Sequence, residues 1–182
     1  MRPEQRPSHL YRLVVTPLLA AMAYILMFLE FPIIPAVPFL KMDFSEIPIV
    51  IATILFGPIS GVVAELIKNV LNFITKSSTG GVGELANFLI GTAYILPLGL
   101  FCRKNRSWKP VLCSCLGGIL LMSVVGFVAN MYLLIPLYGL NDPWPFLTAG
   151  IIPFNLIKGT ILTVLTLFLR KPIHSLDRVL QR

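Results

Sequence analysis

Six predominantly apolar stretches alternate with short polar or Pro/Gly-rich segments along most of the chain. They cover about residues 11–29, 45–56, 59–74, 84–102, 111–135 and 147–169. A helix that crosses a bilayer needs about 20 mostly apolar residues, and most of these stretches approach that length. The pattern predicts an all-α integral membrane protein with six transmembrane helices in a single domain over residues 1–182.

Helix-breaking residues separate the apolar stretches. The segments at 30–44, 75–83 and 136–146 are the longest and the richest in Pro, Gly or Ser, so they are predicted to be loops. Prolines in the first of them exclude a regular helix and predict a structured loop. Ser45 and Glu46 then fit an N-cap and a first-turn acid of the second helix.

Composition and charge support this assignment. The 182 residues are 56% apolar and 13% charged, with a mean hydropathy of +0.84, whereas soluble domains contain about 25% charged residues. The formal charge is +7, but basic residues are concentrated in three blocks: Arg2, Arg6 and Arg12; Arg103, Lys104, Arg106 and Lys109; Arg170, Lys171, Arg178 and Arg182. The three predicted loops hold only Lys41 and Lys76. This asymmetry predicts cytoplasmic termini and external loops, rather than a nucleic-acid partner.

Two groups of polar residues fall within the predicted helices, where ionisable side chains usually face a partner or a cavity. Glu65, Lys68 and Asn69 lie on one stripe of the third helix, together with Asn72. A Glu–Lys pair three residues apart can neutralise itself, and Asn can pack between helices. A structural network and a direct substrate role are therefore both open for this stripe.

The second group is Asn155 and Lys158 on one face of the sixth helix, with Asn130 in the outer half of the fifth. The sixth helix has no acid to neutralise Lys158, although Glu65 from the third helix could do so. Two amides and an ammonium can read the carbonyl and ring-nitrogen edge of a flat heterocycle. A binding pocket is favoured over simple helix packing, and Asn87, one turn into the fourth helix, belongs to the same layer.

Other kinds of chemistry find little support in the sequence. Cys102, Cys113 and Cys115 lack the paired spacing of a metal site, and no metal is expected. Without a Walker A sequence, any ATP used must be hydrolysed by another chain. A small membrane enzyme acting on lipid would need acids or histidines at the membrane face. The cytoplasmic side offers only Glu4, Asp177, His9 and His174, so the chain is not expected to be an enzyme.

Several segments match a known family. They are FLKMDFSEIP at 39–48, FGP at 56–58, ELIKN at 65–69 and SSTGGVGELANF at 77–88, together with Asn130 and the Asn155-x-x-Lys158 pair. Over about residues 10–170 the chain resembles the riboflavin-specific S components, the substrate-binding subunits of energy-coupling factor (ECF) transporters.

The resemblance implies a six-helix S component in the bacterial plasma membrane that binds riboflavin near its outer face, under the loop between the first two helices. Carried onto this chain, Asn130, Asn155 and Lys158 would hold the isoalloxazine edge. The residues around the ring and the ribityl chain would be Leu40, Lys41, Gly83 and Asn87. Riboflavin would be the substrate and not a cofactor. The implied partners are a transmembrane coupling subunit and two cytoplasmic ATPases.

The family docks to its coupling subunit through an Ala-x-x-x-Ala pair on the first helix. Here Ala20, Ala21 and Ala23 do not have that spacing, but Thr16 and Ala20 form a small-xxx-small pair. Thr16, Ala20 and Ala23 are therefore the expected docking residues. The nearest alternatives are an S component for another vitamin or for a flavin nucleotide. A phosphorylated flavin would call for more basic residues in the outer layer than Lys41 and Lys76.

Overall fold

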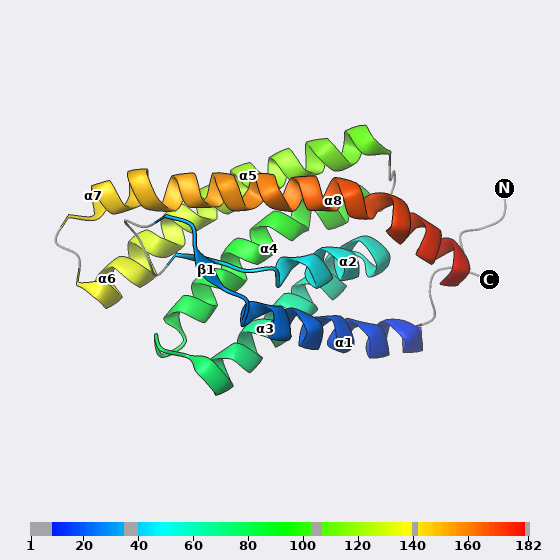
Figure 1. The fold of residues 1–182 in the computed structure, drawn as a ribbon, viewed down its shortest axis with the longest axis horizontal. Coiled ribbons are helices and arrows are strands. Elements are labelled where there is room, and N and C mark those ends of the chain that lie inside the picture. Colours follow the sequence, from blue (N-terminus) through cyan, green and yellow to red (C-terminus); the bar gives the residue numbers. More distant parts are fainter. Residues whose placement is uncertain (1–8, 35–39, 103–106, 140–141, 181–182) are drawn as a thin grey trace.

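The computed structural model describes residues 9–34, 40–102, 107–139 and 142–180, most of them in helices (Figure 1). The first four helices are α1 (His9–Met27), α2 (Glu46–Phe56), α3 (Pro58–Lys76) and α4 (Val82–Cys102). Next come α5 (Trp108–Ala129), the π-helix η1 (Asn130–Leu134) and α6 (Ile135–Tyr138), end to end. The last rod contains α7 (Pro143–Phe146), the π-helix η2 (Leu147–Ile151) and α8 (Ile152–Leu180). The expected all-α architecture is confirmed.

The loop predicted at 136–146 is shorter than expected, because helix continues from both sides into it. Pro143 lies in the first turn of α7, where a missing N–H leaves no helical bond unmade. Pro136 lies in α6 directly after the π-helix η1, where the type of helix changes. Gly139 ends α6 with a φ of 60°, in the left-handed region that suits glycine. The Asp142 carboxylate accepts a hydrogen bond from the Trp144 N–H and caps α7.

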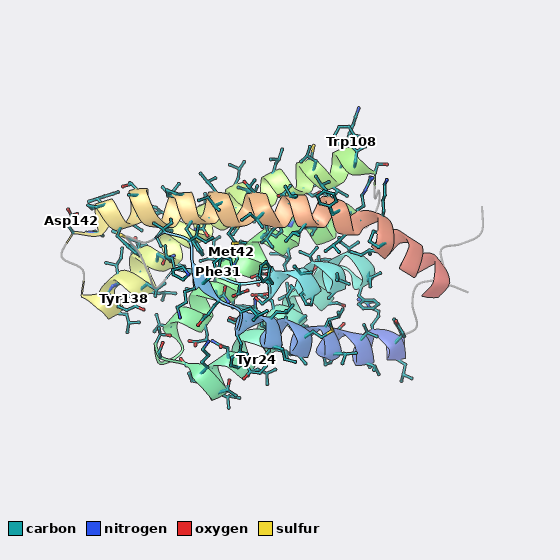
Figure 2. All side chains as sticks on the ribbon, in the orientation of Figure 1. Tyr24, Phe31, Met42, Trp108, Tyr138 and Asp142 are labelled. Carbon is teal, nitrogen blue, oxygen red and sulfur yellow. The ribbon has the colours of Figure 1, made fainter. Side chains whose placement is uncertain are left out.

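The structured loop predicted at 30–44 contains a small hairpin. Strand β1 (Phe31–Pro32) pairs antiparallel with β2 (Lys41–Met42), with Phe31 opposite Met42 and Pro32 opposite Lys41. The rings of Phe31 and Phe44 lie 6.1 Å apart, centroid to centroid. Figure 2 shows Phe31 and Met42 between the end of the bundle marked by Asp142 and the opposite end marked by Trp108.

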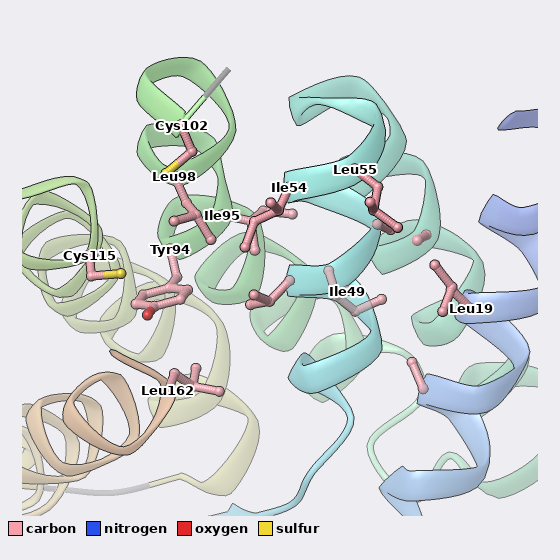
Figure 3. Close-up of a cluster of buried hydrophobic side chains, with 14 of the residues drawn as sticks. Leu19, Ile49, Ile54, Leu55, Tyr94, Ile95, Leu98, Cys102, Cys115 and Leu162 are labelled. Carbon is pink, nitrogen blue, oxygen red and sulfur yellow. The ribbon is translucent and has the colours of Figure 1, made fainter. Parts of the chain in front are cut away.

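The short helix α2 is the centre of the apolar core. It packs against α1, α3, α4 and α8, and nine of its 11 residues are buried. Figure 3 shows Ile54 of α2 on the side of Ile95 and Tyr94 of α4, and Ile49 on the side of Leu19 of α1, with Leu162 of α8 near Tyr94. A helix that is surrounded on every side needs apolar residues all round. This explains why α2 is apolar except for Glu46 and Thr53.

Helix α1 uses its small residues inside the chain. Thr16, Ala20 and Ala23 are 5%, 0% and 0% exposed, on a helix that packs against α2 and α3. Small side chains let helix backbones approach closely, so these three residues serve this internal contact. In this structure they are buried against the neighbouring helices, and their role in docking to a partner stays a prediction. The outward face of α1 consists of other side chains: Leu10, Leu13, Val14, Leu18, Met22 and Ile25.

Four helical segments among the described residues are long and apolar enough to cross a membrane. They are Leu10–Met27, Val82–Cys102, Trp108–Tyr138 and Pro143–Ile173. Helix α2 is shorter, and α3 is not among the four, so the six-span topology stays a prediction. The start of α1 and the end of α8 lie at the same end of the bundle, opposite α6 and α7 (Figure 1).

Candidate ligand-binding site

The hairpin, the α3–α4 turn and the helices η1 and α8 enclose a cavity of about 330 Å³. Every residue expected around the ligand lines it: Leu40, Lys41, Gly83, Asn87, Asn130, Asn155 and Lys158. Apolar side chains such as Ile90, Leu134 and Phe154 supply the rest of the wall. The structure thus brings together residues from four separate parts of the sequence.

Two buried amides lie in this wall with acceptor atoms to offer. The Asn130 Nδ2 donates to the carbonyl oxygen of Gly126 at 2.6 Å, which fixes the orientation of the amide. The Oδ1 atoms of Asn130 and Asn155 have no hydrogen-bond partner among the described residues, although the two residues are only 2% and 1% exposed. A buried acceptor without a donor costs about 1–3 kcal/mol, so a ligand with N–H groups would be stabilised here.

Gly126 makes room for one of these amides. A side chain at this position of α5 would collide with the Asn155 amide, which comes from α8. Helices α5 and α8 pack against each other, and the absence of a Cβ lets the amide fit between them. Gly126 therefore belongs to the construction of the site, although the sequence alone gave no reason to select it.

Lys158 reaches the cavity wall from α8 and is 4% exposed. Its Nζ lies 3.3 Å from Oε1 of Glu46, at the start of α2. The sequence suggested Glu65 as the acid that neutralises Lys158, and this is wrong. Glu65 instead pairs with Lys68 at 2.7 Å within α3. Glu46 takes the expected place of Glu65 because α2 packs against both α3 and α8.

Three residues of the polar α3 stripe, Glu65, Lys68 and Asn69, lie behind the cavity, whereas the fourth, Asn72, lines it. Glu65 and Lys68 are fully buried, and Asn69 is 4% exposed. The Asn69 Nδ2 donates to Glu65 Oε1 at 3.0 Å, and its Oδ1 accepts from the Nδ2 of Asn87 at 3.1 Å. Of the residues in this hydrogen-bonded series, Asn87 lines the cavity. The geometry favours a supporting network for the stripe over a direct substrate role.

At the mouth of the cavity, defined here as Glu30, Lys41 and Lys76, one carboxylate oxygen joins two lysines. Glu30 Oε1 accepts from the Nζ atoms of Lys41 and Lys76, each at 2.8 Å. Partial burial alone would raise the pKa of Glu30, but hydrogen bonds from both lysines outweigh it and hold that pKa below 4.5. The contact links the hairpin to the end of α3.

Other polar residues of the cavity wall, among them Glu84, Thr79 and Asp43, were not selected from the sequence. Glu84, in the first turn of α4, accepts from Asn72 Nδ2 at 3.1 Å and from Thr79 Oγ1 at 3.0 Å. All three line the cavity, as does Asp43. An acid at the start of an apolar helix was the available signal, for Glu84 as for Glu46, but it also fits a simple helix cap. Among the described residues no group of His, Cys, Asp and Glu could hold a metal ion.

The sequence pattern of the family described as "ECF transporter, substrate-specific component" matches residues 11–170. The chain belongs to this family. It is 40% identical to the riboflavin transporter FmnP of Bacillus subtilis over 165 residues, covering 84% of this chain and 86% of that protein. It is 34% identical to the riboflavin transporter RibU of Staphylococcus aureus over 177 residues, covering 92% and 93%.

A solved structure of the S component of a bacterial ECF transporter superposes with a TM-score of 0.81 at 34% sequence identity. The match covers 93% of this chain and 98% of that one. The S-component fold expected from the sequence is therefore confirmed. The family consists of transport components, in agreement with the expectation that the chain is not an enzyme.

Proposed function

We propose that this S component binds riboflavin in the cavity between the hairpin, η1 and α8. The observation that carries the proposal is the pair of buried amide oxygens of Asn130 and Asn155, which share one cavity with the Lys158 ammonium. The isoalloxazine edge of riboflavin alternates carbonyl oxygens with ring nitrogens, one of which bears a hydrogen. Such an edge offers both the donor that the amides lack and acceptors for the lysine.

The remaining wall suits the rest of the ligand. Ile90 and Phe154 give apolar surface for the ring, and the turn with Thr79 and Gly83 offers polar groups for the ribityl hydroxyls. Both relatives described above are named riboflavin transporters, which supports the same substrate. The two lysines at the mouth share Glu30, so a phosphate group would have to compete with that carboxylate. We therefore expect riboflavin to bind more tightly than its phosphorylated form.

The same proposal includes the setting of the protein. Six helices cross the bacterial plasma membrane, with the cavity near the outer face and both termini in the cytoplasm. The basic residues flank the helices on one side, which supports this orientation. Substrate passes to the cytoplasm together with a transmembrane coupling subunit and two ATPases, because the sequence contains no phosphate-binding loop of its own.

Riboflavin binding is directly measurable. The protein purified in detergent should quench riboflavin fluorescence without ATP, and flavin mononucleotide should compete more weakly. Asn155→Ala should weaken binding about 5- to 150-fold, which corresponds to about 1–3 kcal/mol for an unpaired polar group. Thr160→Ala on the exposed side of α8 is a matched control that should bind like the wild type. A wild-type protein that fails to quench riboflavin would refute the proposal.

A further inference from the structure

Glu46 lies one layer behind the cavity and contacts Lys158, the lysine of α8 that lines it. Its side chain is 1% exposed and is not part of the cavity wall. One oxygen, Oε1, lies 3.2 Å from the Nζ of Lys68 and 3.3 Å from the Nζ of Lys158. The two lysines come from α3 and α8, so a single carboxylate of α2 joins three helices at this point.

The two lysines depend on Glu46 to different degrees. Lys68 also pairs with Glu65 at 2.7 Å and donates to the Ser45 hydroxyl at 3.2 Å. Lys158 forms its ion pair among the described residues with Glu46, and Glu65 lies farther from it. Two ammonium groups held near one another in a buried site repel strongly. Without the carboxylate, Lys68 would keep its own partners while Lys158 would be pushed from its place.

We propose that Glu46 is a positioning residue for the ligand, which fixes the Lys158 ammonium at the cavity wall and cancels its charge. The inference rests on the proposed function, since it names the residue that aims a ligand-binding side chain. Glu46, Glu65, Lys68 and Lys158 give the buried cluster two carboxyl groups and two amino groups, so acids and bases are equal in number. A balanced cluster suits the uncharged edge of a flavin ring and leaves the remaining N–H donors of Lys158 for that edge.

The backbone around Glu46 explains how this carboxylate is itself held. Glu46 is the first residue of α2, where the helix dipole stabilises a negative charge. Just before it, Asp43 Oδ1 accepts from the Ser45 N–H at 2.7 Å, in a buried turn that follows strand β2. The hairpin, the start of α2 and Lys158 therefore form one connected unit around the cavity.

A double-mutant cycle tests the inference. Glu46→Gln keeps the shape of the side chain and removes its charge, and Lys158→Met removes the lysine. Riboflavin affinity should fall about 5- to 100-fold in Glu46→Gln, within the range of coupled neighbours. In the Lys158→Met background the same change should cost less than about twofold, because Glu46 then has no Lys158 ammonium to position and the two effects are coupled.

Glu65→Gln is the matched control, because it also removes a buried acid from the cluster but one that pairs with Lys68. Because Glu65 has no ion pair with Lys158, its effect on affinity should depend on Lys158 much less than the effect of Glu46→Gln does. The absorption band of bound riboflavin gives a second readout that a merely structural role would not move. Glu46→Gln should shift this band relative to the wild type, and the shift should vanish in the Lys158→Met background.

Equal losses of affinity from Glu46→Gln in the two backgrounds would overturn the inference. Should Glu46→Gln fail to fold, Glu46→Asp keeps the charge and draws it back by one methylene. It should then weaken binding in the wild type but not in Lys158→Met, and equal losses would again overturn the inference. A wild-type protein that binds no riboflavin would refute the proposed function instead, so the two failures are distinguishable.

Discussion

The two ends of helix α2 lie in very different surroundings. At its start, Glu46 meets two lysines in a buried cluster next to the cavity. At its end, Leu55 and Phe56 lie in the apolar core with α1 and α4 (Figure 3). The apolar core is stabilised by close packing, and its van der Waals contacts do not depend on direction. The charge cluster is held by specific partners, and each loss of a partner leaves a buried charge.

This contrast teaches that stability and binding are separable in the molecule. Substitutions in the core should change the stability of the fold and leave the affinity of the folded protein intact. Substitutions near the cavity should change affinity. The buried thiols of Cys102 and Cys115 are built-in reporters of unfolding, since each is at most 1% exposed, and their reaction with a thiol-specific dye requires the core to open.

The largest effect is expected at Tyr94, which is fully buried in the core. Tyr94→Ala removes a large side chain from a close-packed site and its hydroxyl contact with Thr163 at 3.3 Å. Unfolding should become easier by about 3–5 kcal/mol, seen as faster labelling of the buried thiols. Tyr132→Ala, at a position 73% exposed, is the control and should have little effect. A loss of riboflavin affinity in folded Tyr94→Ala would contradict the separation of the two regions.

The next effect concerns the small residues of α1. Ala20→Trp places a large ring where the side chain is 0% exposed, so it should destabilise the fold by about 1–3 kcal/mol or more. Leu18→Trp changes the outward face of the same helix, where Leu18 is 59% exposed, and should leave the fold intact. The rates of thiol labelling of the two variants compare their stability. Equal stability would mean that Ala20 does not serve the internal packing of α1.

A smaller effect, on ligand binding, is expected at Gly126, where α5 packs against α8. Gly126→Ala adds a methyl group that collides with the Asn155 amide, so riboflavin binding should weaken about tenfold, or about 1.4 kcal/mol. Gly117→Ala is a matched control on the same helix, since an added Cβ there meets nothing within 4 Å. Fluorescence quenching should show wild-type affinity for Gly117→Ala alone. Equal affinities of both variants would show that Asn155 does not bind the ligand in the position found here.

The smallest effect is expected at the mouth. Glu30→Gln removes the charge that joins Lys41 and Lys76, and these partly exposed pairs should contribute only about 0.2–1 kcal/mol. Because the pKa of Glu30 is lowered in the folded protein, its contribution is present above the ordinary value of 4.5 and is lost as pH falls through the lowered one. Thermal unfolding followed by circular dichroism across this pH range should show the loss in the wild type and not in Glu30→Gln.

Much of the site was predictable from the sequence, for a physical reason. Polar residues in a lipid-facing chain need a partner or a cavity, and helical spacing put Asn155 and Lys158 on one face. Their common cavity with Asn130 confirms that these residues come together. The role of each in binding remains a prediction.

What the sequence could not supply was the identity of neighbouring helices. From the sequence, either Glu46 or Glu65 could be the acid that pairs with Lys158. Helix α2 packs between α3 and α8, and this packing places Glu46 next to Lys158. The same gap explains α1, where small residues fit internal packing as well as docking. The ends of the loop at 136–146 were missed because a proline usually breaks a helix, yet Pro136 lies where η1 changes to α6 and Pro143 lies in a first turn.

The shared carboxylate at the mouth also bears on the timing of ligand exchange. Lys41 belongs to the hairpin and Lys76 to the end of α3, and both hold the same oxygen of Glu30. A single event, such as protonation of Glu30 or its rotation away, releases both lysines together, so the mouth should open as one unit and not in two independent steps. Salt screens such exposed contacts. The residence time of the ligand should therefore shorten with ionic strength, even where the equilibrium affinity changes little.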